Sequence, residues 1–128
     1  MNGAELRLKR ITLGITPNTL ANRIGVKHDT LMKWETDRIP IPNDVANTVN
    51  NMWENIIDKA DIIRDYLEET AAAQGTQPDT VTLHVYLSSE AHKAAKTGMS
   101  WEEHTAMVGL LAAILDYEGY MVTVEYRK

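Results

Sequence analysis

The residues most able to recognise a ligand occur close together, between positions 28 and 33. His28, Asp29, Met32 and Lys33 would share one face of a helix, because side chains three and four residues apart are neighbours on a helix surface. A lysine can donate to O6 and N7 of guanine, a carboxylate can accept from N4 of cytosine, and a methionine can contact the thymine methyl group. The spacing therefore predicts a face that reads base edges, with a G·C pair in the target.

Local signals around this face predict two helices joined by a tight turn. Thr16 is a good N-cap and Pro17 suits a first helical position, so we expect a helix from Pro17 to about Ile24. Gly25 can adopt a positive φ angle, and a second helix should start near Lys27 or His28. This is a helix-turn-helix candidate, although an αα-hairpin that only fills a core remains the alternative. The residues expected to point inward are Leu20, Ala21, Ile24, Val26, Leu31 and Trp34.

No pattern in the chain favours catalysis. His84, His92 and His104, with Glu103, fit no metalloprotease-type spacing, and there is neither a glycine-rich phosphate loop nor a nucleophile elbow. The chain contains no cysteine, so nothing suggests thiol chemistry or a cysteine metal site. We expect these histidines to be scattered over the surface. We also expect no enzyme activity, no catalytic residue, no metal ion and no cofactor, and no small-molecule ligand is evident.

The flanking segments should hold the two helices in place. A first helix is predicted from about Gly3 to Leu13, and Arg10 lies on its apolar stripe between Leu6 and Leu13. A buried, unpaired charge is costly, so we predict a structural ion pair between Arg10 and Glu35. After the second helix of the candidate motif, residues 39–42 read as a stiff linker with two prolines.

The remainder of the chain predicts one long helix and a small mixed tail. Helical spacing continues from Asn43 to about Ala73, and residues 74–79 read as a boundary loop. The tail should then form a strand over 80–87, a short helix to about Lys96, a helix from Ser100 to about Tyr117 and a strand over 120–126. We therefore expect domains at 1–73 and 74–128. Two strands make a poor sheet alone, so the tails should pair across a two-fold axis. The later apolar residues of the long helix would be covered by a second chain or by the tail.

Charge is divided unevenly along the sequence. The net charge is −5, but residues 1–38 carry seven basic and four acidic side chains and residues 39–128 carry six basic and fourteen acidic ones. The N-terminal part is therefore at +3 and the remainder at −8, which suits a basic binding head on an acidic body. No apolar run is long enough for a signal peptide or a membrane span, so we expect a cytoplasmic protein without membrane contact.

From about Leu6 to Pro42 the chain resembles the Cro/CI-type (XRE) family of bacterial and phage helix-turn-helix repressors. Within that family it looks most like the YdiL-like group, which includes the anti-CRISPR-associated (Aca) autorepressors that bind operators as dimers. The narrower match comes from Trp34-Glu35, the run from Pro40 to Val45, the long helix and the mixed tail. The wider match is carried by Arg10, Leu13-Gly14, Thr16, Leu20-Ala21, Ile24-Gly25-Val26, Leu31, Trp34-Glu35 and Arg38.

The resemblance implies a mainly α fold: a lambda-repressor-like helix-turn-helix bundle, a long connecting helix and a β-α-α-β dimerisation segment. It implies a sequence-specific transcriptional regulator, a homodimeric repressor that binds an inverted-repeat operator in double-stranded DNA. Two positions depart from the family, since Pro17 replaces the usual phosphate-clamping Gln and Asp37 replaces a Gly in a left-handed conformation. The alternative is an antitoxin or adaptor that uses the same fold and its acidic body to bind proteins. The expected phosphate-binding residues are Thr16, Asn18, Lys27 and Arg38.

Overall fold

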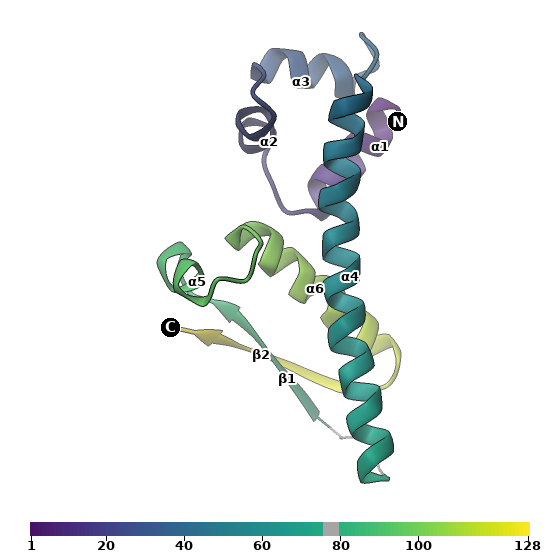
Figure 1. The fold of residues 1–128 in the computed structure, drawn as a ribbon, viewed down its shortest axis with the longest axis vertical. Coiled ribbons are helices and arrows are strands. Elements are labelled where there is room, and N and C mark those ends of the chain that lie inside the picture. Colours follow the sequence, from purple (N-terminus) through teal and green to yellow (C-terminus); the bar gives the residue numbers. More distant parts are fainter. Residues whose placement is uncertain (76–79) are drawn as a thin grey trace. The chain divides into compact units, whose positions relative to one another are not determined.

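The computed structural model describes residues 1–75 and 80–128, and these form two compact units, residues 1–55 and 56–128. The described chain is mainly helical, with six helices and two strands (Figure 1). No helix among the described residues is both long and apolar enough to cross a membrane. In chain order the elements are α1 (Gly3–Thr12), α2 (Pro17–Ile24), α3 (His28–Glu35), α4 (Asn43–Gln74), β1 (Thr80–Tyr86), α5 (Ser89–Ala95), α6 (Trp101–Tyr117) and β2 (Met121–Arg127).

The helix ends of the first unit follow from local capping. The side chain of Asn2 accepts from the backbone N–H of Glu5 at the start of α1, and α2 begins at Pro17 behind the N-cap Thr16. Gly25 ends α2 with a φ angle of 84°, a left-handed conformation that costs glycine little. The helix-turn-helix expected from the sequence is thus present with the predicted bounds of α2.

The core of the first unit is built from the faces predicted to be apolar. Leu6, Leu20 and Leu31 are completely buried, one from each of the first three helices. Val45 and Val49 add the first turns of α4 to this core. Ile24 and Val26, which were expected inside, are only half-buried, because they lie at the turn between α2 and α3.

The turn after α3 is fastened to the start of α1. Asp37 has a φ angle of 60°, the left-handed conformation expected at this position, and its Oδ1 accepts a 2.7 Å hydrogen bond from the backbone N–H of Gly3. Gly3 is required here, since a Cβ atom would overlap with the carbonyl oxygens of Trp34 and Glu35. The carboxylate therefore satisfies a free amide in the first turn of α1.

α4 is one continuous helix of 32 residues that contributes to both units. Val45 and Val49 are buried in the first unit, and Ile56 and Ala60 are buried in the second. The division between the units lies at Asn55 and Ile56, inside α4, whereas the boundary expected at residues 73 and 74 comes at the end of this helix.

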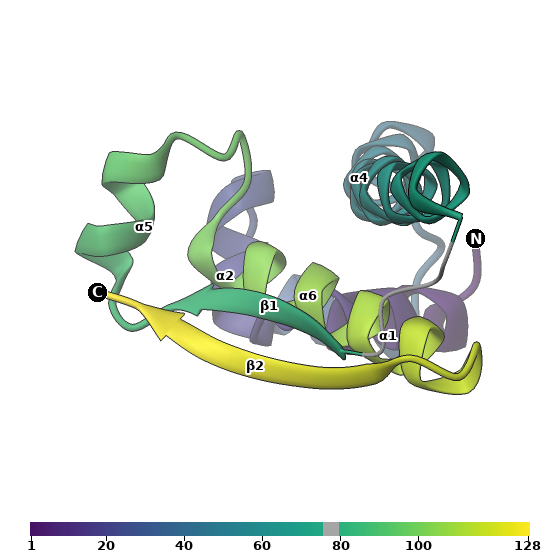
Figure 2. The ribbon, with the colours of Figure 1, turned by 90° about the horizontal axis from the view of Figure 1, so that it is seen from below.

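The second unit has a two-stranded parallel sheet covered by α6. β1 pairs with β2 in the same chain, with Thr80 opposite Met121 and Tyr86 opposite Arg127. Figure 2 shows α6 lying across one face of this sheet, and the two strands running side by side. The buried residues of this face are Val81, Leu83, Met107, Val108, Leu111 and Leu115. β1 and β2 therefore pair within one chain.

Candidate nucleic-acid interface

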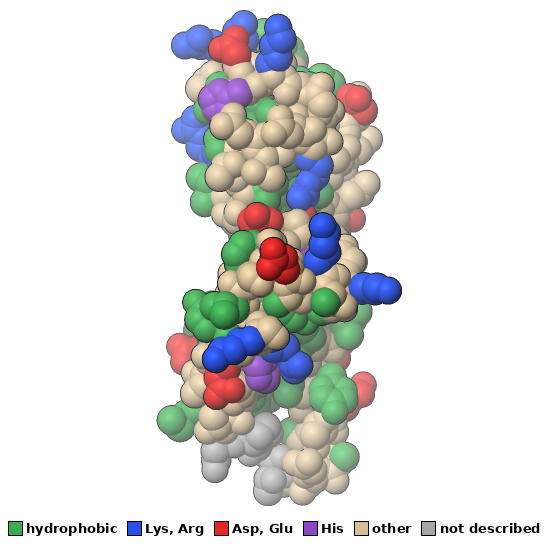
Figure 3. Space-filling view, turned by 90° about the vertical axis from the view of Figure 1, so that its left-hand side faces the viewer, with side chains coloured by type: hydrophobic (Ala, Val, Ile, Leu, Met, Phe, Trp, Pro, Cys, Tyr) green, Lys and Arg blue, Asp and Glu red, His purple; other side chains and the backbone are tan. Residues whose placement is uncertain are grey.

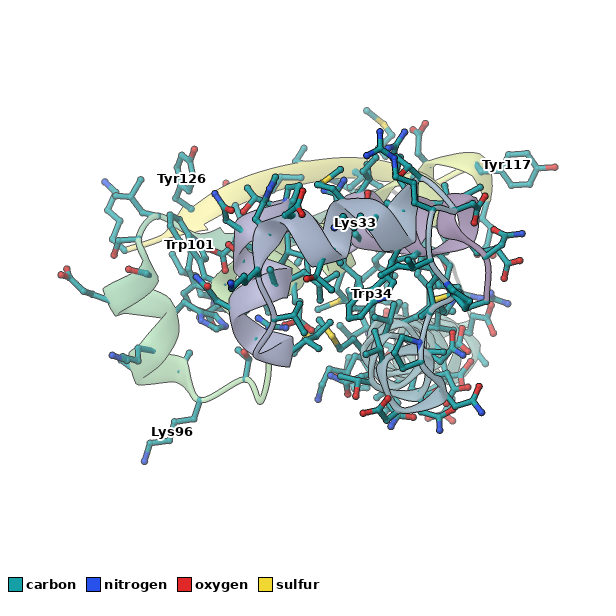
Figure 4. The ribbon with its side chains drawn as sticks, turned by 90° about the horizontal axis from the view of Figure 1, so that it is seen from above. Lys33, Trp34, Lys96, Trp101, Tyr117 and Tyr126 are labelled. Atoms are coloured by element: carbon teal, nitrogen blue, oxygen red, sulfur yellow. The ribbon has the colours of Figure 1, made fainter. Side chains whose placement is uncertain are left out.

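The outer face of α3 is uncovered in the described structure. His28 and Asp29 are exposed, and Met32 and Lys33 are half-buried on the same face. Lys33 lies on the outer side of the helix, whereas Trp34 points to the interior of the first unit (Figure 4). Lys33 Nζ lies 3.2 Å from Asp29 Oδ2, one helical turn away, and the two side chains are 44% and 78% exposed. Such surface pairs contribute only about 0–1 kcal/mol, so both groups remain available to a ligand.

Of the residues expected to hold phosphates, Lys27 and Arg38 flank α3 in the chain, whereas Thr16 and Asn18 lie at the start of α2. Thr16, Asn18, Lys27 and Arg38 are all exposed. Among the described residues, Lys27 and Arg38 have no ion-pair partner, and Lys27 caps α3 without a side-chain hydrogen bond. Thr16 Oγ1 is already engaged, because it accepts from the Thr19 amide at 3.2 Å and donates to Thr19 Oγ1 at 2.9 Å. Figure 3 shows Lys and Arg side chains gathered at the α3 end of the first unit.

A buried carboxylate fixes the end of α3. The side chain of Glu35 is completely buried, and Arg10 binds it in a fork, with Nε 2.8 Å from Oε2 and Nη2 3.0 Å from Oε1. The remaining guanidinium nitrogen, Nη1, donates to the carbonyl of Ile15 at 3.2 Å. The pair predicted from the sequence is therefore present. Arg7 adds an unpredicted contact, with Nε 3.3 Å from Glu35 Oε1.

Lys9 connects α1 to α4. Its Nζ donates to Asn50 Oδ1 at 2.7 Å and lies 5.6 Å from the centre of the Trp53 ring. The structure therefore gives this lysine a packing role. The partners lie 41 and more residues away, so helix spacing alone could not have found them.

The sequence matches the Aca2/YdiL-like family over residues 1–118. The protein belongs to this family. It is also 30% identical over 129 residues to a protein of Pyrobaculum aerophilum whose name assigns it provisionally to the HTH-type transcriptional regulatory proteins. That alignment covers 98% of this chain and 46% of the relative, so the chain spans about half the length of the curated relative it matches.

The histidines of this Aca2/YdiL-like protein are not all scattered over the surface, which corrects the expectation from the sequence. His92 is buried, and its Nε2 lies 2.5 Å from Thr97 Oγ1. The Tyr86 ring meets the rings of His92 and His104 edge-on, with centroids 5.3 and 5.1 Å away. His84 is the exception, half-buried with Nε2 3.8 Å from Glu125 Oε2. Glu103 is buried as well.

This aromatic cluster favours a neutral imidazole at His104. Burial lowers the pKa of His104 below its ordinary 6.5, and the neighbouring His92 lowers it further. Its Nδ1 is buried without a hydrogen-bond partner in the described structure. Within the described residues no group of three or more His, Asp or Glu side chains is arranged to hold a metal ion. The cluster therefore packs the start of α6 against β1 and α5.

Proposed function

We propose that this protein regulates transcription by placing α3 in the major groove of a specific DNA site. The single observation that carries this is the uncovered outer face of α3, where His28, Asp29 and Lys33 lie together. A recognition helix reads bases mainly from its N-terminal residues, which is where His28 and Asp29 occur. Met32 is placed one turn further on for contact with a thymine methyl group.

Phosphate contacts would fix the orientation of the helix on the duplex. Lys27 and Arg38 lie at opposite ends of α3, and neither has an ion-pair partner among the described residues. Both can therefore neutralise backbone phosphates, a contribution that holds the protein in register but carries no sequence information. Asn18 is exposed in the first turn of α2 and can add a neutral hydrogen bond. Pro17 has no backbone N–H that could donate to a phosphate. The phosphate contacts made by α2 must therefore come from side chains.

A second copy of the chain would complete the regulator. Met121, Val124 and Tyr126 of β2 are 68%, 51% and 63% exposed, which is unusual for apolar residues of a strand. Pairing of β2 with its counterpart across a two-fold axis would extend the sheet to four strands and occupy the free edge of β2. The two recognition helices would then enter major grooves about 34 Å apart, over an inverted repeat. Bound at a promoter, such a dimer blocks polymerase and represses transcription.

The test is equilibrium binding to the DNA upstream of the protein's own gene, measured by fluorescence anisotropy at several salt concentrations. Lys33→Ala should weaken operator binding by about 1–3 kcal/mol and relax specificity, because a base contact is lost. Arg38→Ala should weaken binding to every sequence alike and reduce the salt slope by about one. Lys93→Ala, at an exposed position of α5, serves as the control with the same loss of charge. Unchanged affinity and specificity in Lys33→Ala would refute this placement of α3.

A further inference from the structure

The second unit contains a cavity that neither the sheet nor the proposed DNA-binding face uses. It has a volume of about 260 Å³ and lies between the second half of α4, the loop before α6 and α6 itself. Its apolar wall comes from Ile62 and Ile63 of α4, Met99 of the loop and Met107 of α6. Methionine side chains adapt to ligands of different shape, because they are unbranched and polarisable. The volume is below the roughly 300–1,000 Å³ of drug-sized sites, so only a small molecule fits.

The polar part of the cavity consists of Lys59, Thr97 and His104. Thr97 Oγ1 is engaged with His92 Nε2 and the carbonyl of Met99. Lys59 is half-buried, and its ammonium group makes no hydrogen bond or ion pair with any described residue. Its Nζ lies beside Gly98 of the loop, 4.0 Å from the position that a Cβ atom would take at this residue.

Two observations separate this cavity from ordinary imperfect packing. Residues 56–128 contain six basic and twelve acidic side chains, yet Lys59 at the cavity has no acidic partner among the described residues. The His104 ring, which lines the cavity, also carries the one buried side-chain nitrogen or oxygen of the described residues that lacks a hydrogen-bond partner. Buried polar groups in folded proteins are normally satisfied. A free cation beside an apolar wall is the arrangement that an amphipathic anion requires.

We propose that this cavity binds a small apolar carboxylate. The hydrocarbon part lies against Ile62, Ile63, Met99 and Met107, and the carboxylate accepts hydrogen bonds from the Lys59 ammonium group. The ligand enters from solvent beside Ile62, a residue that is 67% exposed. The site belongs to the second unit alone, so this inference does not depend on the proposed DNA binding.

The experiment is a titration of the full chain labelled with ¹³C at the methionine methyl groups and followed by NMR. Octanoate is the probe, with 1-octanol as the neutral and octylamine as the cationic analogue of equal length. We expect saturable shifts at Met99 and Met107, which Met99→Leu and Met107→Leu assign, and a clear preference for octanoate. Met1, Met32, Met52 and the exposed Met121 act as internal references for non-specific binding.

Variants that remove one positive charge test whether Lys59 binds the carboxylate of octanoate. Lys59→Gln should weaken octanoate binding about tenfold and leave octanol binding unchanged, because a charge-assisted hydrogen bond is lost. Lys93→Gln removes the same charge at an exposed position of the same unit and should bind octanoate like the unmodified protein. The proposal is overturned if the shifts at Met99 and Met107 do not saturate, if octylamine binds as well as octanoate, or if the two variants bind octanoate equally. No DNA is involved in these measurements, so such a failure leaves the proposed function untouched.

Discussion

At the scale of single residues, the buried carboxylate of Glu35 does most to fix α3 against α1. It accepts from both guanidinium groups of α1, and its side chain is fully buried, whereas that of Arg7 is 48% exposed and that of Arg10 only 10%. Removal of one partner from a buried ion pair is expensive because the other charge is left uncompensated. The two arginines should therefore differ strongly in their contribution to stability.

Arg10→Ala should lower the free energy of unfolding by about 3 kcal/mol, since the fork to Glu35 and the bond to the Ile15 carbonyl are both lost. Arg7→Ala is the matched control and should cost less than about 1 kcal/mol, because its contact is longer and half-exposed. Urea denaturation of the two variants measures the difference. Equal midpoints in the two proteins would contradict this account of Glu35.

The half-buried imidazole of His104 predicts a pH dependence of stability. Its pKa is lowered in the folded state, first by burial and then by His92, so the unfolded chain binds more protons at mildly acidic pH. Its contribution to stability is complete above pH 6.5 and is lost as the pH falls below that value through the folded-state pKa. Urea midpoints between pH 8 and pH 5 should therefore fall less steeply in His104→Gln than in the unmodified protein. His28→Gln, at an exposed position, should keep the full slope.

At the scale of elements, the turn that ends α3 also begins α1. Asp37 adopts a left-handed conformation and accepts from the Gly3 amide, so its backbone and its carboxylate act together. Asp and Asn tolerate this conformation better than other residues with a Cβ, and their short side chains carry an acceptor oxygen. The replacement of the family's usual glycine by Asp37 is therefore compensated by a hydrogen bond that glycine cannot make.

Substitutions at Asp37 should separate these two effects. Asp37→Ala should cost roughly 2 kcal/mol, because it loses the capping bond and still requires a left-handed backbone. Asp37→Asn and Asp37→Gly should each cost less than about 1 kcal/mol, since the first keeps an acceptor and the second relieves the backbone. Thermal unfolding of the three variants gives the order. A glycine variant as unstable as the alanine variant would contradict it.

Helices proved easier to predict than the contacts between them. Thr16, Gly25 and Ser100 act on backbone groups within a few residues, so the ends of α2, α3 and α6 followed from the sequence. The parallel pairing of β1 with β2 depends on a crossover through α5 and α6. The local spacing of apolar residues does not indicate such a pairing. The cluster of His92 with His104 was missed for the same reason, because the two rings come from separate helices. The contact between Arg10 and Glu35 could be predicted from the sequence, because a charged residue on the apolar face of a helix requires a partner of opposite charge.

At the scale of the whole molecule, the exposed side of β2 is the surface at which we propose that a second copy packs. Six of the seven residues of β2 are exposed, and the described sheet has two strands, a size that is marginal without further partners. The exposed tyrosines Tyr117 and Tyr126 both point away from the second unit (Figure 4). Aromatic residues of this kind are enriched at protein interfaces.

Val124→Lys should convert the proposed dimer to a monomer, because it places a charge in the strand edge that would pair with its counterpart. Light scattering at micromolar concentration measures the mass, and the operator affinity of the variant should fall as the second recognition helix is lost. Ala94→Lys introduces the same charge at an exposed position of α5 and should remain dimeric. A monomeric mass for the unmodified protein, with full operator affinity, would overturn the two-fold arrangement.

α3 is attached to α1 through the single carboxylate of Glu35, so a substitution at this contact should make the protein temperature-sensitive. Arg10→Lys keeps the positive charge but loses the planar fork that satisfies both oxygens of Glu35. A decrease of about 1–2 kcal/mol in the free energy of unfolding would lower the melting temperature by several degrees, and the variant would still fold at low temperature. Under the proposed function, such a variant would hold its target gene in one state in cool cultures and release it on mild warming, as a heat-inducible genetic circuit requires.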